Sequence, residues 1–361
     1  MITTEHTFSA PPSYPLERLG QPESLLFFDI ETTGFSASRH QIYLIGCICY
    51  ASGTWKLTQW FADTPKAEGD VLTAFFNYAR SFTTLVHFNG DTFDIPFLLK
   101  RFDAWDLPWD FTSFTSMDIY KSVRPFRKIM GLDSLKQKAI EQFLGILRQD
   151  PYTGGQLIDV YRFYLESPKE DLYKMLMLHN REDLEGMPRI LSILYYADIP
   201  KQEFSLTEQS IQKQTDIFGE SVYSLLLTLT GQDMLPAPVQ WESSHASCHA
   251  FQNRLELTIP LEQDTLKYFY PDYKDYYYLI YEDTAVHKSV GEYVERTARK
   301  KATAQTCYTK KTALFLPQPD TLWSPAFKKT YKDKQLFAEY VPGLFDSPKT
   351  LRAYINYLLD I

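Results

Sequence analysis

Residues 25–34 read Leu-Leu-Phe-Phe-Asp-Ile-Glu-Thr-Thr-Gly. Four apolar residues before two acids that are two positions apart predict a buried β-strand at about 25–31, with Asp29 and Glu31 on the same face. Carboxylates on the buried face of an apolar strand are costly unless something cationic compensates them. Two like charges side by side either raise a pKa or recruit a cation, and hard oxygen ligands suit Mg²⁺. This stretch therefore predicts a core strand that carries metal ligands.

Two later motifs supply further acids. Asp94 ends the run Asn-Gly-Asp-Thr-Phe-Asp at 89–94, and Asp183 ends His-Asn-Arg-Glu-Asp at 179–183. Each motif alone is more typical of a turn, a helix cap or a pair of residues on a helix surface. Their occurrence in order, within one domain length and each on a suitable element, favours a carboxylate nuclease.

The three motifs together resemble the DEDD superfamily of 3′–5′ exonucleases, which have an RNase H-like fold. The run Asp-Ile-Glu-Thr-Thr-Gly at 29–34 is similar to the first family motif. The pattern Asn-x-x-x-Phe-Asp at 89–94 resembles the second motif of family B polymerase proofreading domains and of the YprB-like bacterial branch. In the third motif, His179 stands four residues before Asp183, a spacing that resembles the branch with Tyr at this place. The resemblance covers residues 24–200.

Phosphodiester hydrolysis on two Mg²⁺ ions is the activity that this resemblance implies, and Mn²⁺ is expected to substitute. We expect Asp29 to be shared between the ions, and Glu31 and Asp183 to hold the ion that activates the attacking water. Asp94 would contact the ion at the leaving group, mainly through water. His179 lies one helical turn before Asp183, so it is placed to orient or deprotonate the water.

Other residues of the motifs are candidates for substrate binding. The loop Thr32, Thr33 and Gly34 follows the first strand, where hydroxyl and N–H groups suit the 3′ end of the terminal nucleotide. Asn89 is expected to contact substrate or to fix the second motif, and its Asn-Gly pair also reads as a simple turn. Asp118 ends another apolar strand and is interpreted mainly as a structural cap, with a role behind the metal ligands as the alternative.

A length of 361 residues indicates two domains. We expect an N-terminal arm at 1–23, an RNase H-like exonuclease domain at 24–200 and an α+β domain at 201–361. The predicted class is α/β, with a mixed sheet flanked by helices in the first domain. No apolar run is long enough for a membrane span, the first twenty residues lack an apolar signal core, and the four cysteines form no CxxC pair. These features favour a cytoplasmic protein with no membrane partner.

Periodicity and turn residues predict the elements of both halves. In the first half, strands are expected at 25–31, 41–50, 54–62, 83–88 and 114–119. Helices are expected there at 66–80, 94–103, 132–144, 155–166 and 169–196. In the second half we expect helices at 206–230 and 347–359, and strands at 253–259 and 276–281.

The formal net charge of −8 argues against indiscriminate affinity for nucleic acid. Between His287 and Lys334, however, eleven Lys and Arg residues face only four acids. Aromatic residues are interleaved with these cations: Tyr308, Phe315, Trp323, Phe327 and Tyr331. Cations beside stacking faces suit single-stranded nucleic acid, so this window is predicted to be a substrate platform, with a solvated face as the alternative. Its candidate substrate-binding residues are Lys300, Lys301, Lys310 and Lys311.

The leading hypothesis is a Mg²⁺-dependent 3′–5′ exonuclease that acts on single-stranded ends of DNA or RNA. A non-catalytic nucleic-acid-binding module on a nuclease-like fold is the second hypothesis, suggested by the His in the usual place of Tyr. Retention of all four carboxylates weighs against it, because a pure binder has no use for their repulsion. The third hypothesis is a structure-specific endonuclease of junctions or hybrids.

Overall fold

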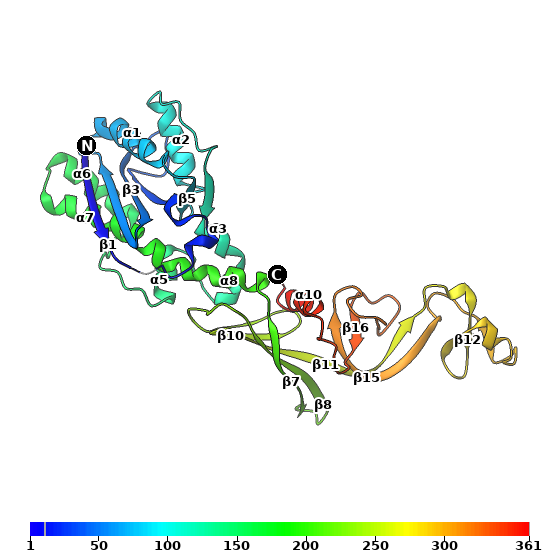
Figure 1. Cartoon of the computed structure of the whole chain (residues 1–361). Helices are drawn as coiled ribbons and strands as arrows, with labels where there is room; N and C mark the ends of the chain where they lie inside the picture. The colour runs from blue at the N-terminus through cyan, green and yellow to red at the C-terminus, as the bar shows by residue number, and fades with distance from the viewer. Residues whose placement is uncertain (11, 361) are drawn as a thin grey trace. The chain divides into compact units, whose positions relative to one another are not determined.

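The computed structural model describes residues 1–10 and 12–360 (Figure 1). The chain divides into two compact units, Met1–Asp198 and Ile199–Ile361, and each is described by itself. Within the described residues, no helix is both long and apolar enough to cross a bilayer.

A six-stranded mixed sheet forms the centre of the first unit, in the order β1-β4-β3-β2-β5-β6. Its strands are β1 (Ile2–Phe8), β2 (Leu25–Thr32), β3 (Ile42–Ala51), β4 (Thr54–Phe61), β5 (Thr84–His87) and β6 (Thr115–Asp118). Strands β1, β4, β3 and β2 pair antiparallel with one another, whereas β5 runs parallel to β2 and β6 runs parallel to β5. The five strands expected from the sequence are all present.

Strand β1 lies in the segment that was expected to be an arm. It pairs with β4 along its whole length, from Ile2 opposite Phe61 to Phe8 opposite Trp55. Most of its side chains are exposed, so the segment has no buried apolar face that a sequence pattern can reveal. Backbone pairing at the sheet edge, rather than side-chain burial, orders these residues.

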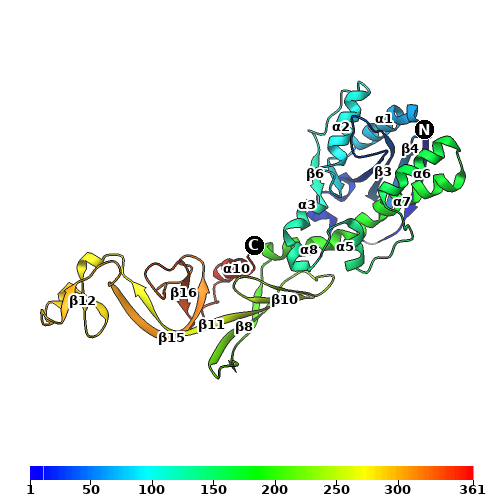
Figure 2. The same cartoon turned by 180° about the vertical axis from the view of Figure 1, so that it is seen from behind.

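Helices cover both faces of this sheet (Figures 1 and 2). They are α1 (Glu68–Ala79), α2 (Asp94–Ala104), α3 (Ile119–Val123), α4 (Arg127–Met130), α5 (Gln137–Phe143), α6 (Gly154–Glu166), α7 (Glu170–Ile190) and α8 (Leu194–Asp198). One core packs apolar residues of α1 and α2 against β2 and β3, including Phe28, Phe75 and Phe97. A second core packs α6 and α7 against β3 and β4, including Tyr161 and Leu176. The helix expected at 169–196 is thus divided into α7 and α8, and only 137–143 of the helix expected at 132–144 forms.

A glycine allows α7 to approach the sheet closely. A Cβ atom on Gly46 of β3 would lie 2.1 Å from Asn180 Oδ1 and 2.4 Å from Leu184 Cδ1. Any side chain at this position would therefore push α7 away. Because Gly46 pairs with Asp29 across the β2–β3 ladder, the close approach brings the third motif against the first.

The second unit is built almost entirely from antiparallel strands. Its main sheet contains β7 (Ser205–Thr215), β8 (Ser221–Thr230), β9 (Val239–Glu242), β10 (Ser247–Phe251), β11 (Arg254–Phe269), β15 (Tyr308–Gln318) and β16 (Leu336–Glu339). A smaller sheet contains β12 (Tyr276–Leu279), β13 (Thr284–His287) and β14 (Arg299–Lys301). The helices are α9 (Lys288–Gly291) and α10 (Pro348–Leu358), and α10 confirms the helix expected at 347–359.

The helix expected at 206–230 is wrong, because this stretch forms the β7–β8 hairpin. Leu225, Leu227 and Leu229 are buried while their neighbours are more exposed, which is the two-residue period of a strand. Asp216 closes the turn by accepting hydrogen bonds from the N–H groups of Phe218 and Glu220. The error came from reading a leucine-rich run as helical when the side chains alternate between the two faces of a sheet.

Candidate active site

Carboxylates from two elements meet at the carboxyl end of the central strand. Asp29 and Glu31 lie on β2, and Glu31 is only 7% exposed. Asp94 is the first residue of α2, is buried, and accepts a hydrogen bond of 3.2 Å from the backbone N–H of Ile30. That bond ties the start of α2 to the strand between the two acids, so the first two motifs form one cluster.

The environment of the cluster resists ionisation. Burial, followed by repulsion from Glu31, Asp183 and Asp94, raises the pKa of Asp29 well above its ordinary value. Burial, followed by repulsion from Asp183 and Asp94, also raises the pKa of Glu31 well above its ordinary value. For Asp94, burial raises the pKa to about 7, although the Ile30 N–H opposes the shift. Buried carboxylates that repel one another are stabilised by a bound cation, and an all-oxygen donor set fits Mg²⁺ or Mn²⁺.

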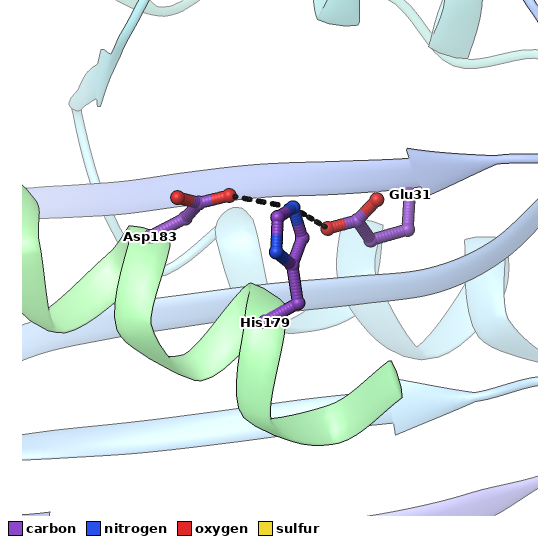
Figure 3. A group of neighbouring side chains, drawn as sticks. All are labelled: Glu31, His179 and Asp183. Carbon is purple, nitrogen blue, oxygen red and sulfur yellow. Dashed lines mark ion pairs between the residues drawn. The ribbon is translucent and has the colours of Figure 1, made fainter. Parts of the chain in front are cut away.

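Helix α7 brings His179 and Asp183 to these acids (Figure 3). The Nε2 atom of His179 lies 3.8 Å from Glu31 Oε1 and 3.4 Å from Asp183 Oδ2. Glu31, His179 and Asp183 each offer one ligand atom, and these three atoms lie within 4.8 Å of one another. The structure therefore brings the residues of the first and third motifs together around the imidazole ring.

The other ring nitrogen of His179 contacts Asp150, which the sequence analysis did not identify. Nδ1 lies 2.5 Å from Asp150 Oδ2, and both side chains are buried. Burial alone would raise the pKa of Asp150, but hydrogen bonds from His179 and the Tyr152 N–H, with the charge of Lys138, hold it below its ordinary value. An ionised carboxylate only accepts hydrogen bonds, so neutral His179 carries its proton on Nδ1 and directs the Nε2 lone pair toward Glu31 and Asp183.

Arg148, in the loop before Asp150, holds the last acid of the third motif. Its Nη2 atom donates to Asp183 Oδ1 at 2.5 Å and to Glu141 Oε1 at 2.9 Å. The loop is attached to α7 because the Glu182 carboxylate accepts the N–H groups of Gln149 and Asp150 at 3.0 and 2.8 Å. Neither Arg148 nor Asp150 belongs to a periodic pattern, so no sequence signal marks them.

Two polar side chains orient the acids of β2. Asn180 donates from Nδ2 to Asp29 Oδ2 at 2.9 Å, while its Oδ1 accepts from Gln59 Nε2 at 2.8 Å. Tyr43 donates its hydroxyl to Glu31 Oε2 at 3.5 Å. Asn180 directly follows His179, so the helix presents one residue to each side of the carboxylate cluster. Its place within the third motif is the only signal that could have identified it.

The loop of Thr32, Thr33 and Gly34 is closed by its own hydrogen bonds. Thr32 Oγ1 donates to the Gly34 carbonyl at 3.0 Å, and Thr33 Oγ1 accepts the Gln41 N–H at 3.0 Å. A Cβ atom on Gly34 would lie 2.6 Å from the His40 ring, so only glycine fits there. The two threonine hydroxyls therefore already have partners, at Gly34 and at Gln41.

An exposed aromatic residue follows this loop. Phe35 is 84% exposed, and its ring makes an edge contact with Phe93 at a centroid distance of 6.4 Å. Phe93 immediately precedes Asp94. The sequence analysis did not single out Phe35, although an apolar residue directly after the first motif is a usable signal.

Asn89 stands in a turn that Asp118 holds in place. Its backbone is left-handed, with φ of 63°, and its N–H donates to Asp118 Oδ1 at 2.9 Å. Thr92 donates its hydroxyl to Asn89 Oδ1 at 2.9 Å. Asp118 also accepts the Lys121 N–H at the start of α3, which confirms its expected role as a cap.

A second group of possible ligands, His87, Asp91 and Asp118, surrounds the same turn. His87 Nδ1 accepts the Gly90 N–H at 3.0 Å, so the ring proton lies on Nε2, which faces Ser116 Oγ at 2.8 Å. Burial lowers the pKa of His87, which favours this neutral form. Because both ring nitrogens have partners and Asp118 accepts several N–H groups, the group fixes the second motif rather than offering lone pairs to a metal.

The four lysines of the expected platform lie in the second unit. Lys310 Nζ is 3.0 Å from Asp283 Oδ2, and Lys311 Nζ is 2.6 Å from Glu339 Oε2. These two lysines are consecutive on β15 and so point to opposite faces of the strand. Lys300 lies over the Tyr278 ring at 5.2 Å, and Lys301 ends β14.

Three of the aromatic residues expected to stack on bases cannot do so in this structure. Tyr308, Phe315 and Phe327 are each at most 5% exposed, and Phe315 and Phe327 belong to one core cluster. Tyr331 is 44% exposed and remains accessible. The interleaving of cations and aromatics along the sequence therefore does not give accessible stacking faces at Tyr308, Phe315 and Phe327.

Residues 26–195 match the model of the RNase H superfamily. The match confirms the RNase H-like fold of the first unit and supports a nuclease. No curated protein matches the chain closely enough to count as a relative.

The solved structures to which the chain is similar include the family B DNA polymerase of the archaeon Pyrobaculum calidifontis, at 13% identity and a TM-score of 0.39, covering 67% of this chain and 33% of the polymerase. Another is exonuclease I of E. coli with a dA16 oligonucleotide, at 13% identity and a TM-score of 0.29, covering 57% and 54% of the two chains. A zinc-bound complex of the E. coli exonuclease with single-stranded DNA has 14% identity, a TM-score of 0.28 and the same coverages. The chain thus spans between a third and just over half of these proteins.

Proposed function

We propose that this protein is a metal-dependent 3′–5′ exonuclease that hydrolyses phosphodiester bonds at single-stranded nucleic-acid ends. The observation that carries the proposal is the cluster of mutually repelling buried acids that faces the Nε2 atom of His179. A protein that only binds nucleic acid gains nothing from this repulsion, whereas a metal-dependent hydrolase requires the cluster to hold its ions.

Asp29, Glu31, Asp94 and Asp183 are the residues that would hold two Mg²⁺ ions. Once bound, such ions lower the pKa of the attacking water and neutralise charge on the leaving 3′ oxygen. Neighbouring groups keep the acids oriented: Asn180 for Asp29, the Ile30 N–H for Asp94 and Arg148 for Asp183. Each of these partners occupies a single oxygen of its carboxylate, which leaves the second oxygen for a ligand.

His179 is proposed to act as the general base. Its Nε2 atom takes a proton from the attacking water, while its Nδ1–H group keeps its hydrogen bond to Asp150. The new phosphorus–oxygen bond forms as the bond to the 3′ oxygen breaks, and that oxygen takes a proton from the surrounding water to become the new 3′ hydroxyl. The products are a nucleoside 5′-monophosphate and a strand that is shorter by one nucleotide. Ionised Asp150 stabilises the imidazolium that forms, as the carboxylate of a hydrolase triad does.

Groups on the rim of the site are proposed to bind the terminal nucleotide. The exposed Phe35 ring offers a face on which the last base can stack, and stacking of this kind is worth about 1–3 kcal/mol per base. The loop at 32–34, which is held by hydrogen bonds of Thr32 and Thr33, is proposed to position that end. In the second unit, Lys300 and Lys301 are proposed as further phosphate contacts, since no carboxylate pairs with either within the described residues. Lys310 and Lys311 contribute less, because each already has a carboxylate partner.

A degradation assay with end-labelled single strands tests the proposal. With Mg²⁺ or Mn²⁺, a strand labelled at its 5′ end should give a ladder that shortens with time, and a strand labelled at its 3′ end should release labelled mononucleotide at once. Chelator and the Asp29→Asn variant are the matched controls, and paired DNA and RNA strands identify the sugar preference. Cleavage of a circular single strand would instead indicate the endonuclease, and binding without any cleavage would indicate the non-catalytic module.

A further inference from the structure

A hollow of about 650 Å³ opens beside the second motif. Phe88 and Asn89 line one side, Tyr120 and Arg124 come from the α3 region, and Lys136 and Gln137 come from the start of α5. None of these residues except Asn89 was identified from the sequence as a candidate for substrate binding. The volume of the hollow is in the range of about 300–1,000 Å³ that is usual for small-ligand sites. This volume suits one or two nucleotides rather than a duplex.

The walls of this hollow are cationic in an acidic chain. Three cations, Arg124, Arg127 and Lys136, and one acid, Asp133, line the hollow, whereas the whole chain has a net charge of −8. Arg127, also on the wall, is held by the carbonyl groups of Leu132 and Asp133. Arg124 and Lys136 are exposed and make no ion pair with any residue in the described part of the chain. Two unpaired cations beside a third that carbonyl groups hold in place form a surface for anions.

Aromatic rings accompany these cations. Phe88 and Tyr120 make an edge contact at a centroid distance of 6.0 Å, and both are partly exposed. Cations next to accessible ring faces are the combination that binds single-stranded nucleic acid, because the cations contact phosphates and the rings stack on bases. The buried rings near the lysines of the second unit lack this second feature.

The hollow is connected to the carboxylates on two sides. Asn89 begins the motif that ends at Asp94. The turn at Asn89 is held by hydrogen bonds from the N–H groups of Asn89 and Gly90 to Asp118 and His87. On the other side, Gln137 donates from Nε2 to the backbone carbonyl of Asp183 at 2.8 Å. A strand lying in the hollow is therefore adjacent to residues that hold both the second and the third motif.

We propose that this hollow binds the nucleotides immediately upstream of the scissile bond, with Arg124 and Lys136 on the phosphates and Phe88 and Tyr120 beside the bases. The inference rests on the proposed exonuclease function and adds to it the site that grips the strand. It assigns the main substrate contacts to the first unit rather than to the lysines of the second.

The double variant Arg124→Ala/Lys136→Ala tests the assignment. Binding of a fluorescent single-stranded oligonucleotide is measured by anisotropy over a range of salt concentrations, with Ca²⁺ in place of Mg²⁺. The slope of log affinity against log salt should become shallower by up to about 1.4, from about 0.7 for each lost phosphate contact on a single strand. The matched control, Arg162→Ala/Lys174→Ala, removes the same charge from exposed, paired positions on α6 and α7 and should keep the wild-type slope. Equal slopes for the two double variants would overturn the proposal.

A small substrate separates this inference from the proposed function. The p-nitrophenyl ester of thymidine 5′-monophosphate has no upstream nucleotide, so it reaches the metal site without entering the hollow. The Arg124→Ala/Lys136→Ala variant should hydrolyse it with the wild-type kcat while its KM for the oligonucleotide rises. A matching loss on both substrates would place these residues in the catalytic centre or in folding, and would overturn the inference. If wild-type protein hydrolyses neither substrate, the proposed function fails, and the anisotropy measurement still decides whether the hollow binds the strand.

Discussion

Replacing Asp94 with asparagine should stabilise the metal-free protein while abolishing its activity. The structure gives a direct reason, because Asp94 accepts one hydrogen bond from the Ile30 N–H through Oδ1 and is otherwise buried near other acids. An asparagine can keep that bond through its own oxygen but carries no charge. It therefore behaves as an aspartic acid that never ionises, and it lacks the charge needed to bind a metal ion.

The magnitude follows from the pKa of Asp94, about 7 in the folded protein against an ordinary value of 3.8. A raised carboxyl pKa means that the folded state prefers the protonated form. The contribution of protonated Asp94 to the free energy of unfolding is thus fully present below about pH 4, and it is lost as the pH rises from there through 7. At about 1.4 kcal/mol per pKa unit, the free energy of unfolding of the wild-type protein falls by at most about 4 kcal/mol by pH 8 and by roughly 1–2 kcal/mol by pH 5. The asparagine variant avoids this loss.

Thermal unfolding in chelator between pH 5 and pH 8 measures the effect, with hydrogen exchange of peptides from Leu25–Thr32 as a readout of the first unit alone. The variant should exceed wild type by more at pH 8 than at pH 5, with a difference of up to roughly 10 °C for a unit of this size. Mn²⁺ should raise the unfolding temperature of wild type more than that of the variant. A variant that is less stable than wild type at pH 8 by more than about 2 kcal/mol would refute the reasoning, because the acid would then hold the fold together.

Three further changes test other parts of the site. His179→Ala should lower kcat by roughly 10²–10⁴ with little change in oligonucleotide affinity, and full activity in this variant would exclude His179 as the base. Asp150→Asn, which keeps the side-chain shape but removes the charge that fixes the His179 tautomer, should lower kcat by about 10- to 100-fold, and the ¹⁵N shifts of the His179 ring should show more Nε2–H form. Unchanged ring shifts would mean that Asp150 does not select the tautomer. If the second unit contacts the strand, Lys300→Ala/Lys301→Ala should make the slope of log affinity against log salt concentration shallower by at most about 1.4. A wild-type slope would leave that unit without a role in substrate binding.

The leucine-rich stretch 221–230 shows where local patterns failed. Its residues are compatible with a helix or a strand by composition, and the answer depends on the neighbouring strands that cover one face. Strand β1 illustrates the converse case, because few of its side chains are buried and its order comes from pairing with β4. The central strand at 25–32 was predictable because its apolar run, its acids and the glycine after it all indicate the same structure.

The sequence by itself determined the RNase H-like fold of the first unit, the four acids and the histidine one turn before Asp183. These features are local, since a carboxylate on an apolar strand or at a fixed helical spacing is conspicuous in the chain. Only the tertiary structure decided the partners of these residues: Asp150 on His179, Arg148 on Asp183, Asn180 on Asp29, and the cationic hollow beside Asn89. These contacts join segments that are distant along the chain through loops without periodicity, and the path of a loop depends on the packing around it rather than on its own residues.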